Sequence, residues 1–181
     1  MMPAEIRTQR LVLRPPHMDD LDTCAELLGD YDVAKMLSRV PYPYELESGR
    51  AYLTKAAENW QDPENADELP FHIDQDGQMI GCVSFKKLRA TPEFGYWLGK
   101  PFWGKGYMSE AVHAATCWLF ENTAHRVLAG EAMEENPASL KVLENIGFRV
   151  VGEVGCNSVS RGGSVPAVRA ELHRSEFMTG H

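Results

Sequence analysis

The chain of 181 residues carries 26 acidic and 18 basic side chains, which give it a formal net charge of −8 at pH 7. This charge disfavours a general nucleic-acid binder, because such proteins normally present a basic face, and it suits a cationic partner. No apolar run approaches the ~20 residues needed to span a bilayer, and residues 1–10 hold no signal-peptide core, so we expect neither membrane insertion nor export.

The length and the apolar fraction of 44% are those of one globular domain with a sizeable core. The cysteines form no C-x-x-C pair, and the histidines have no metal-ligand spacing, so neither a zinc site nor a disulfide framework is indicated. We therefore expect a cytoplasmic protein with reduced thiols and no metal. The cysteines are Cys24, Cys82, Cys117 and Cys156.

The first half of the chain predicts one strand followed by helices. Alternating apolar residues from Ile6 to Arg14 predict a strand that ends at the Pro15-Pro16 pair. Apolar residues at helical spacing predict helices over residues 19–28, 33–40 and 45–60. The acidic residues between Glu45 and Glu68 could steer an amine, but a solvated helix face and loop explain them more simply.

The second half alternates strands with helices. Strands are predicted at 71–74, 79–88, 93–98, 126–132, 148–154 and 167–173, and helices at 109–121 and 137–145. Gln75-Asp76-Gly77 is a hairpin turn signal between the first two of these strands, and the polar stretch 155–166 reads as a connection. This order predicts a mixed α/β sheet that is open rather than barrel-like.

The stretch from Trp97 to Ala111 joins a strand pattern to a helix pattern through a loop that contains Gly104 and Gly106. Two glycines one residue apart let backbone amides point into a shared concavity, and the helix that follows adds unpaired N–H groups and the positive end of its dipole. Such a loop can bind a phosphate or pyrophosphate. The glycines alone leave an ordinary tight turn open as the alternative.

A second informative stretch runs from Glu135 to Phe148. Asn136 stands at the N-cap of the predicted helix, Pro137 at its first position and Gly147 just past its end. A capping asparagine contributes about 1 kcal/mol without any ligand, and a serine such as Ser139 in the first turn is often only solvated.

Together with Gly95-Tyr96-Trp97-Leu98 and Trp103-Gly104-Lys105-Gly106-Tyr107 at the observed separation, this stretch resembles the GNAT superfamily of N-acetyltransferases. More narrowly, it is similar to the branch that includes the ribosomal-protein alanine N-acetyltransferases. The resemblance covers residues 8–177, which we expect to form one acetyltransferase domain. It implies a GNAT-like fold with a central, mostly antiparallel sheet that is splayed between two middle strands and flanked by helices.

The resemblance also implies acetyl-CoA as the co-substrate, bound where the two strands splay apart. It implies that backbone groups of Trp97, Leu98 and Gly99 pair with the pantetheine arm, and that the Asn136 side chain contacts this arm. The pyrophosphate would lie on backbone amides of the glycine loop. These amides belong to Gly104, Lys105, Gly106, Tyr107 and Met108.

Acetyl transfer to an amine requires that an ammonium of pKa ~10 loses a proton, that the oxyanion is stabilised and that the departing thiolate is protonated. By resemblance, Ser139 corresponds to a serine proposed to protonate the thiolate. Glu93 is the first candidate for the base, before Glu131 and Glu134, although it could be only a strand-edge charge. A tyrosine that many relatives carry is replaced by Leu143, which adds weight to Ser139 or to water.

The prediction is therefore an acetyl-CoA-dependent N-acetyltransferase that works by direct attack in a ternary complex, as a monomer or homodimer. A backbone N–H near Leu98 or Gly99 could polarise the carbonyl, and no covalent intermediate is needed. The acceptor is either a protein N-terminus, which needs an open groove, or a small amine, which needs a closed one. Candidates to line a closed groove are Tyr42, Tyr44, Trp60 and Phe85.

Two alternatives remain open at this point. A non-catalytic acyl-CoA-binding regulatory module would keep the anion-binding loop and lack the acid and the base. A mononucleotide-binding α/β protein would use the same loop for another ligand.

Overall fold

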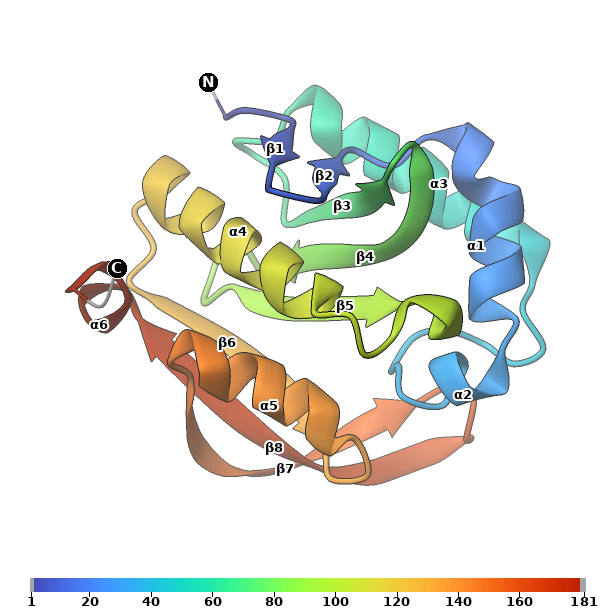
Figure 1. Ribbon diagram of the computed structural model, residues 1–181. Helices are drawn as coiled ribbons and strands as arrows, with labels where there is room; N and C mark the ends of the chain where they lie inside the picture. Colours follow the sequence, from blue (N-terminus) through green and yellow to red (C-terminus); the bar gives the residue numbers. More distant parts are fainter. Residues whose placement is uncertain (1, 180–181) are drawn as a thin grey trace.

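The computed structural model describes residues 2–179, which fold around an eight-stranded sheet with the strand order β1-β2-β3-β4-β5-β6-β8-β7 (Figure 1). The strands are β1 (Ile6–Arg7), β2 (Val12–Arg14), β3 (Glu68–Gln75), β4 (Gln78–Lys86), β5 (Glu93–Leu98), β6 (Val127–Met133), β7 (Arg149–Ser158) and β8 (Gly163–His173). The α-helices are α1 (Leu21–Leu28), α2 (Tyr31–Ala34), α3 (Leu46–Gln61), α4 (Tyr107–Asn122), α5 (Pro137–Ile146) and α6 (Arg174–Thr179). Two short 3-10 helices, η1 (Met18–Asp20) and η2 (Lys100–Phe102), precede α1 and α4.

The sheet is splayed between β5 and β6. These two strands run parallel and pair only at Glu93 with Ala129 and at Phe94 with Gly130, whereas the other neighbouring strands are antiparallel. β6 pairs with β8 along its whole length and follows it away from β5. The structure therefore confirms the predicted open, mixed sheet with a gap between two middle strands.

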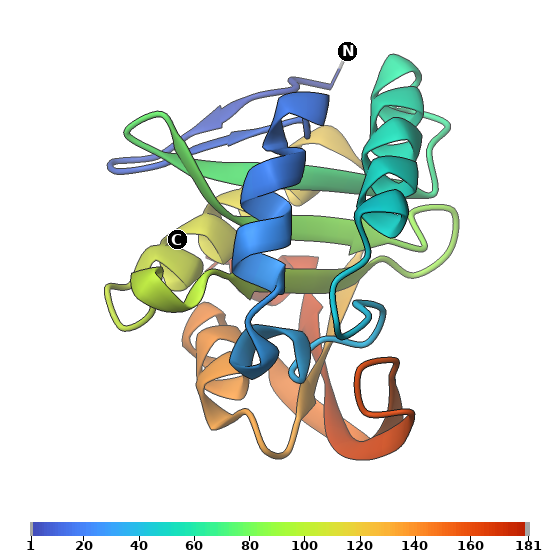
Figure 2. The ribbon, with the colours of Figure 1, turned by 90° about the vertical axis from the view of Figure 1, so that its right-hand side faces the viewer.

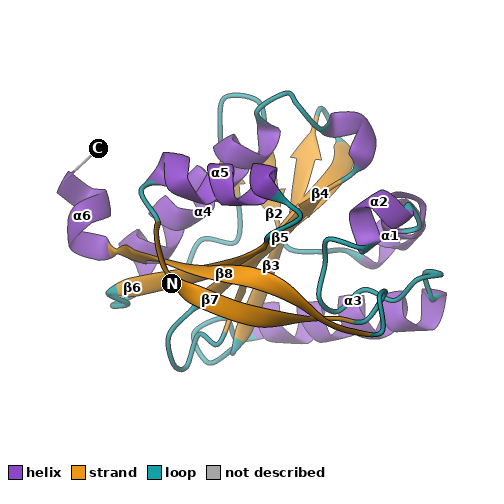
Figure 3. Ribbon diagram, turned by 90° about the horizontal axis from the view of Figure 1, so that it is seen from below, coloured by secondary structure: helices purple, strands orange, loops and turns teal. Residues whose placement is uncertain are grey.

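Helices lie on both sides of the sheet. α4 and α5 cover one face, and α3 lies on the other, with α1 packed where β4 begins and β5 ends (Figures 2 and 3). The main core cluster includes the fully buried Phe71, Phe85 and Leu119. A smaller cluster packs Leu27 of α1 beside Met79.

The structure confirms the helix caps and the hairpin turn that the sequence predicts. Asn136 caps α5 by accepting a hydrogen bond from the Ser139 amide at 3.3 Å, and Gly147 ends this helix with φ at 116°. Asp76 and Gly77, with φ at 51° and 81°, turn β3 into β4. The end of α5 and the β3–β4 turn both need left-handed backbone, which glycine adopts without strain and Asp tolerates.

Several predicted elements differ from the structure. Residues 6–14 form two short strands because the Thr8 amide bonds the Leu11 carbonyl in a turn. The helix expected over 33–40 ends at Ala34, and α6 was not predicted. The expected connection 155–166 is largely strand, because pairs such as Asn157 with Ser164 extend the β7–β8 ladder.

Between residues 2 and 179, no helix is long and apolar enough to cross a bilayer. Over the same residues, no three His, Cys, Asp or Glu side chains gather in the way that a metal ion needs.

A buried network of charges joins β2, β3 and η1. Arg14 donates to Asp20 at 2.8 Å and to Asp74 at 2.6 Å, and His72 Nδ1 lies 2.7 Å from Asp20. Burial alone would raise the pKa of Asp20, but the hydrogen bonds from His72 and Arg14 hold this pKa well below its usual value. Burial lowers the pKa of His72, so we assign a neutral imidazole that donates Nδ1–H to an ionised Asp20.

Arg14→Met is expected to lower the free energy of unfolding by about 3 kcal/mol, because it leaves Asp20 and Asp74 as uncompensated, largely buried charges. Urea unfolding at pH 7 measures the loss. Arg7→Met is the control, since Arg7 is exposed, pairs with the similarly accessible Glu5, and should matter by less than about 0.5 kcal/mol. Equal losses in the two variants would show that the network adds nothing beyond a surface pair.

Candidate active site

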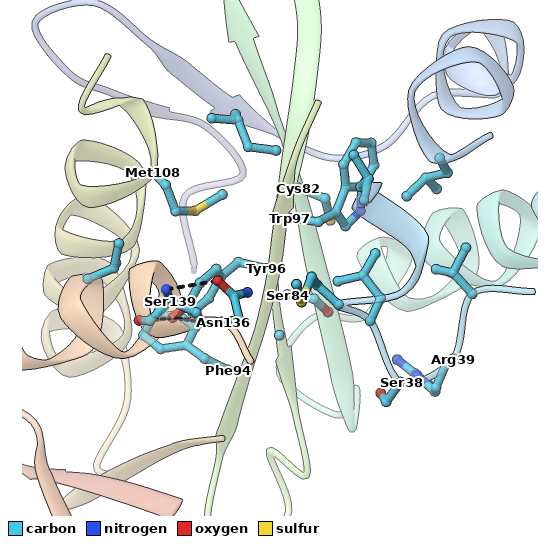
Figure 4. A pocket seen from close by; sticks show the side chains of 18 of the residues that line it. Ser38, Arg39, Cys82, Ser84, Phe94, Tyr96, Trp97, Met108, Asn136 and Ser139 are labelled. Carbon is cyan, nitrogen blue, oxygen red and sulfur yellow. Dashed lines mark hydrogen bonds between the residues drawn. The ribbon is translucent and has the colours of Figure 1, made fainter. Parts of the chain in front are cut away.

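A cavity of about 730 Å³ runs along the unpaired edge of β5 and reaches both faces of the sheet. Successive β5 side chains point to opposite faces, so Tyr96 faces α5 while Trp97 faces the segment between α2 and α3 (Figure 4). We call these two parts of the cavity the α5 side and the α2–α3 side. The α5 side is lined by Met108, Asn136, Ser139 and Val142, and the α2–α3 side by Ser38, Arg39, Tyr44, Cys82, Ser84 and Lys86.

The glycine loop has the geometry of an anion cradle. Gly104 and Gly106 adopt φ of 75° and 79°, and α4 begins at Tyr107 without a side-chain cap. Within the described part of the chain, no acceptor is recorded for the amides from Gly104 to Met108. A Cβ on Gly104 would meet nothing within 4 Å, so the space before the loop is open. The residues therefore fit a phosphate group, and the binding itself stays a prediction.

The turn between β1 and β2 clamps this loop. Arg10 donates from Nη1 to the Lys105 carbonyl at 2.9 Å and from Nε to Glu110 at 2.7 Å, and its guanidinium stacks over the Tyr107 ring. Thr8 also donates to Glu110, at 2.6 Å. No local sequence pattern predicts this clamp, because its partners lie about a hundred residues apart in the chain.

The free edge of β5 differs in detail from the prediction. Gly99 donates its N–H to the Ile80 carbonyl at 2.8 Å and accepts from Phe102 at 2.9 Å, so both of its backbone groups already have partners within the chain, and its pairing with the pantetheine arm stays a prediction. The backbone N–H and C=O groups of successive residues point alternately to the two sides of a strand. Those of Trp97 therefore also point toward β4, like the N–H of Gly99. The groups that face the gap are those of Tyr96 and the N–H of Leu98.

Tyr96 and Ser139 form a hydrogen-bonded pair on the α5 side. The Tyr96 hydroxyl lies 2.8 Å from Ser139 Oγ and donates to the Ser139 carbonyl at 3.0 Å (Figure 4). Burial raises the pKa of Tyr96 to about 12, so the phenol stays protonated at neutral pH. Tyr96 is absent from the predicted catalytic residues. Successive side chains of a strand point to opposite faces of the sheet, and this rule could have placed Tyr96 on the face that α5 covers.

Glu93 lies at the start of β5 in a cluster of ion pairs. Its Oε1 accepts hydrogen bonds of 2.9 Å from both Lys87 and Arg169. Partial burial alone would raise the pKa of Glu93, but the hydrogen bonds from Arg169 and Lys87 outweigh it and leave this pKa below its usual value. Glu131 also lines the cavity, whereas Glu134 is outside its lining.

The tip of the β7–β8 hairpin ties down the segment that follows α2. The Val159 amide donates to the Ser38 carbonyl at 3.0 Å, and Arg161 Nε donates to the Lys35 carbonyl at 3.0 Å. Figure 2 shows this hairpin tip beside the segment that follows α2, below α1. The contact therefore fixes the backbone of the segment that carries Ser38 and Arg39 of the cavity lining.

Of the aromatic residues expected to line a closed groove, Tyr44 does so. Phe85 is fully buried in the core, and Trp60 donates to the Pro70 carbonyl and packs on Phe71. Tyr42 is exposed against Tyr31. The expectation was wrong for these three residues, because the alternation of β4 turns Phe85 away from the cavity and α3 packs Trp60 inward.

Three cysteines line the cavity, and each is held as a thiol. Burial raises the pKa of Cys82 to about 12 and that of Cys24 to about 12, and it also raises the pKa of Cys156. A thiol with a raised pKa supplies little thiolate, which is the nucleophilic form.

A family model described as "Acetyltransferase (GNAT) domain" matches residues 10–149. Among curated relatives, a protein described as the uncharacterized N-acetyltransferase p20 of Bacillus licheniformis is 23% identical over 173 residues, which cover 94% of this chain and 96% of that protein.

Solved structures show the same fold. The ribosomal-protein-S5-alanine acetyltransferase of Vibrio fischeri superposes with a TM-score of 0.81 at 18% identity and covers 97% of this chain and 99% of that one. The microcin C7 self-immunity acetyltransferase MccE, solved with acetyl-CoA and AMP, has a TM-score of 0.79 at 17% identity, with 92% and 93% covered. At these identities the likeness establishes the fold alone.

Proposed function

The chain belongs to the acetyltransferase (GNAT) domain family and is an N-acetyltransferase that uses acetyl-CoA, and we propose that it acetylates a small primary amine by direct attack in a ternary complex. One observation carries this proposal: a single cavity crosses the sheet beside β5, with an anion cradle near one end and a pocket of mixed apolar and polar lining at the other. Such a cavity brings donor and acceptor together from opposite faces of the sheet.

On the donor side, the amides from Gly104 to Met108 would hold the pyrophosphate. The gap-facing groups of Tyr96 and Leu98 would pair with the pantetheine arm as an added strand does. Asn136 caps α5 through its side-chain oxygen, which leaves its NH₂ group for this arm. The bound thioester supplies the acyl carbon that the amine attacks.

The tethered α2–α3 side favours a small acceptor over a protein N-terminus. Hydrogen bonds from the Val159 amide and the Arg161 side chain hold the backbone of Ser38 and Lys35, so an extended peptide on this side would have to displace the tethered segment. Some similar proteins are named as acetyltransferases of ribosomal proteins. The proposal of a small amine does not follow from those names and rests on this chain's own pocket.

Proton transfer is assigned to groups that line the cavity. Glu93 is held ionised by Lys87 and Arg169, and we propose that it draws the ammonium proton away through water, with Glu131 as the second carboxylate. The Leu98 N–H is the donor for the oxyanion. Ser139, hydrogen-bonded to Tyr96, is the donor for the departing thiolate.

Steady-state kinetics test this function. With acetyl-CoA, small primary amines are expected to be acetylated with a kcat/KM at least about 10-fold above that of peptides with free N-termini, because the peptides must displace the hairpin tip. Double-reciprocal plots should intersect, as direct attack requires, whereas parallel lines would indicate a covalent enzyme intermediate. Thermal protection by CoA without turnover of any amine would favour the non-catalytic alternative.

A further inference from the structure

A lysine lies beside the gap on the α2–α3 side. Lys86 stands opposite Glu93 in the β4–β5 ladder, and Ser84 stands opposite Gly95. The Lys86 Nζ lies 3.0 Å from the point where a Cβ would stand on Gly95, so the ammonium leans across the bare backbone of β5. Lys86 also lines the cavity. The absence of a side chain at position 95 thus places a positive charge next to the gap.

The acids around Lys86 are engaged by other cations. Glu68 accepts from Arg39 at 2.8 Å, and Glu93 accepts from Lys87 at 2.9 Å. No hydrogen bond or ion pair to Lys86 is recorded among residues 2–179. Burial and the neighbouring charge of Arg39 lower the pKa of Lys86 by more than Glu68 and Glu93 raise it.

A local count of charges singles out the same residue. Arg169 bonds Glu93 and also lies near Glu171 at 3.4 Å and Glu131 at 3.8 Å. The cluster therefore holds four cations (Arg39, Lys86, Lys87 and Arg169) and four acids (Glu68, Glu93, Glu131 and Glu171), so it is balanced in charge. Among these four cations, Lys86 is the one for which no ion pair is recorded within residues 2–179.

We propose that Lys86 binds an anionic group of the acceptor, so that the substrate is a small amine that also carries a carboxylate or a phosphate. The inference rests on the proposed function and deepens it. An anion on Lys86 would supply the partner that the ammonium lacks, and the position above Gly95 sets the anion close to the amine that reacts in the gap. Arg39, on the same side of β5, supplies the second positive charge (Figure 4).

Matched pairs of amines test the proposal. The probes are amino acids against their amides for the carboxylate, and O-phosphoethanolamine against ethanolamine for the phosphate. Wild type is expected to favour the anionic member of at least one pair by about 10-fold or more in kcat/KM. Lys86→Met should lower kcat/KM for the anionic member of the pair more than for the neutral member, so that the ratio between them falls to about 1, and Lys86→Arg should restore most of the preference. Lys55→Met, on exposed α3, is the charge-matched control and should keep it.

The outcomes separate the inference from the function. The inference fails, while the N-acetyltransferase function stands, if wild type acetylates the neutral and anionic members with equal kcat/KM. It fails equally if Lys86→Met lowers kcat/KM for both members by the same factor. If no amine is acetylated, the function fails, and binding decides the inference. In that case the anionic probes must raise the melting temperature of CoA-bound wild type more than that of CoA-bound Lys86→Met, and equal shifts would overturn the proposal.

Discussion

Gly104→Asp is expected to raise the KM for acetyl-CoA by about 100-fold. The Cβ would enter the open space before the anion cradle, where nothing lies within 4 Å, and the carboxylate would stand beside the pyrophosphate. Two like charges about 4 Å apart near a protein surface repel by roughly 1 to 4 kcal/mol, and about 2.7 kcal/mol corresponds to 100-fold. Isothermal titration with CoA should show a comparable rise in the Kd for CoA, without turnover.

Two control variants isolate the charge. Gly104→Asn has nearly the same size and tolerates left-handed backbone, so it should raise KM by less than about 10-fold. Gly77→Asp makes the same substitution at nearly the same φ in the β3–β4 turn, where a Cβ also meets nothing within 4 Å, and it should leave KM unchanged. If Asn and Asp at position 104 raise KM equally, strain in the loop is responsible, and the anion cradle is not supported.

The features that the sequence predicted are those encoded within about fifteen residues. The caps of α5 at Asn136 and Gly147 and the Asp76–Gly77 turn follow from side-chain chemistry and φ preference, which act locally. The glycine loop was found in the same way, because its amides and the start of α4 are neighbours in the chain. The gap beside β5 came from the family resemblance, and the pairing of β5 and β6 at two positions now explains it.

The features that the sequence missed depend on contacts between distant segments. Arg10 with Glu110 and Tyr96 with Ser139 are far apart in the chain, and only the sheet order brings them together. The position of Lys86 over Gly95 needs the β4–β5 register as well. Net charge is equally uninformative here, because a count over the whole chain does not show which cation beside the gap has an acidic partner and which has none.

Tyr96→Phe and Ser139→Ala are each expected to lower kcat by about 100-fold, with less than a 3-fold change in the KM for acetyl-CoA. Each removes one hydroxyl of the pair that we assign to the departing thiolate, and loss of a proton donor costs 10²-fold or more. Because burial raises the pKa of Tyr96 to about 12, the phenol should not limit kcat between pH 6 and about 10. Stopped-time assays of CoA release across this range measure both effects, and Tyr31→Phe on the exposed surface is the control.

The double variant decides whether the two hydroxyls act as one unit. If they donated independently, the losses would multiply to about 10⁴-fold, whereas a shared hydrogen-bonded pair predicts a double variant within a few-fold of either single one. Urea unfolding should show a loss of only about 1 kcal/mol for each variant, as expected for one hydrogen bond. A Ser139→Ala enzyme with wild-type kcat would reduce Ser139 to a residue of the first turn of α5, and a rise in KM alone would show that Tyr96 only positions this helix against β5.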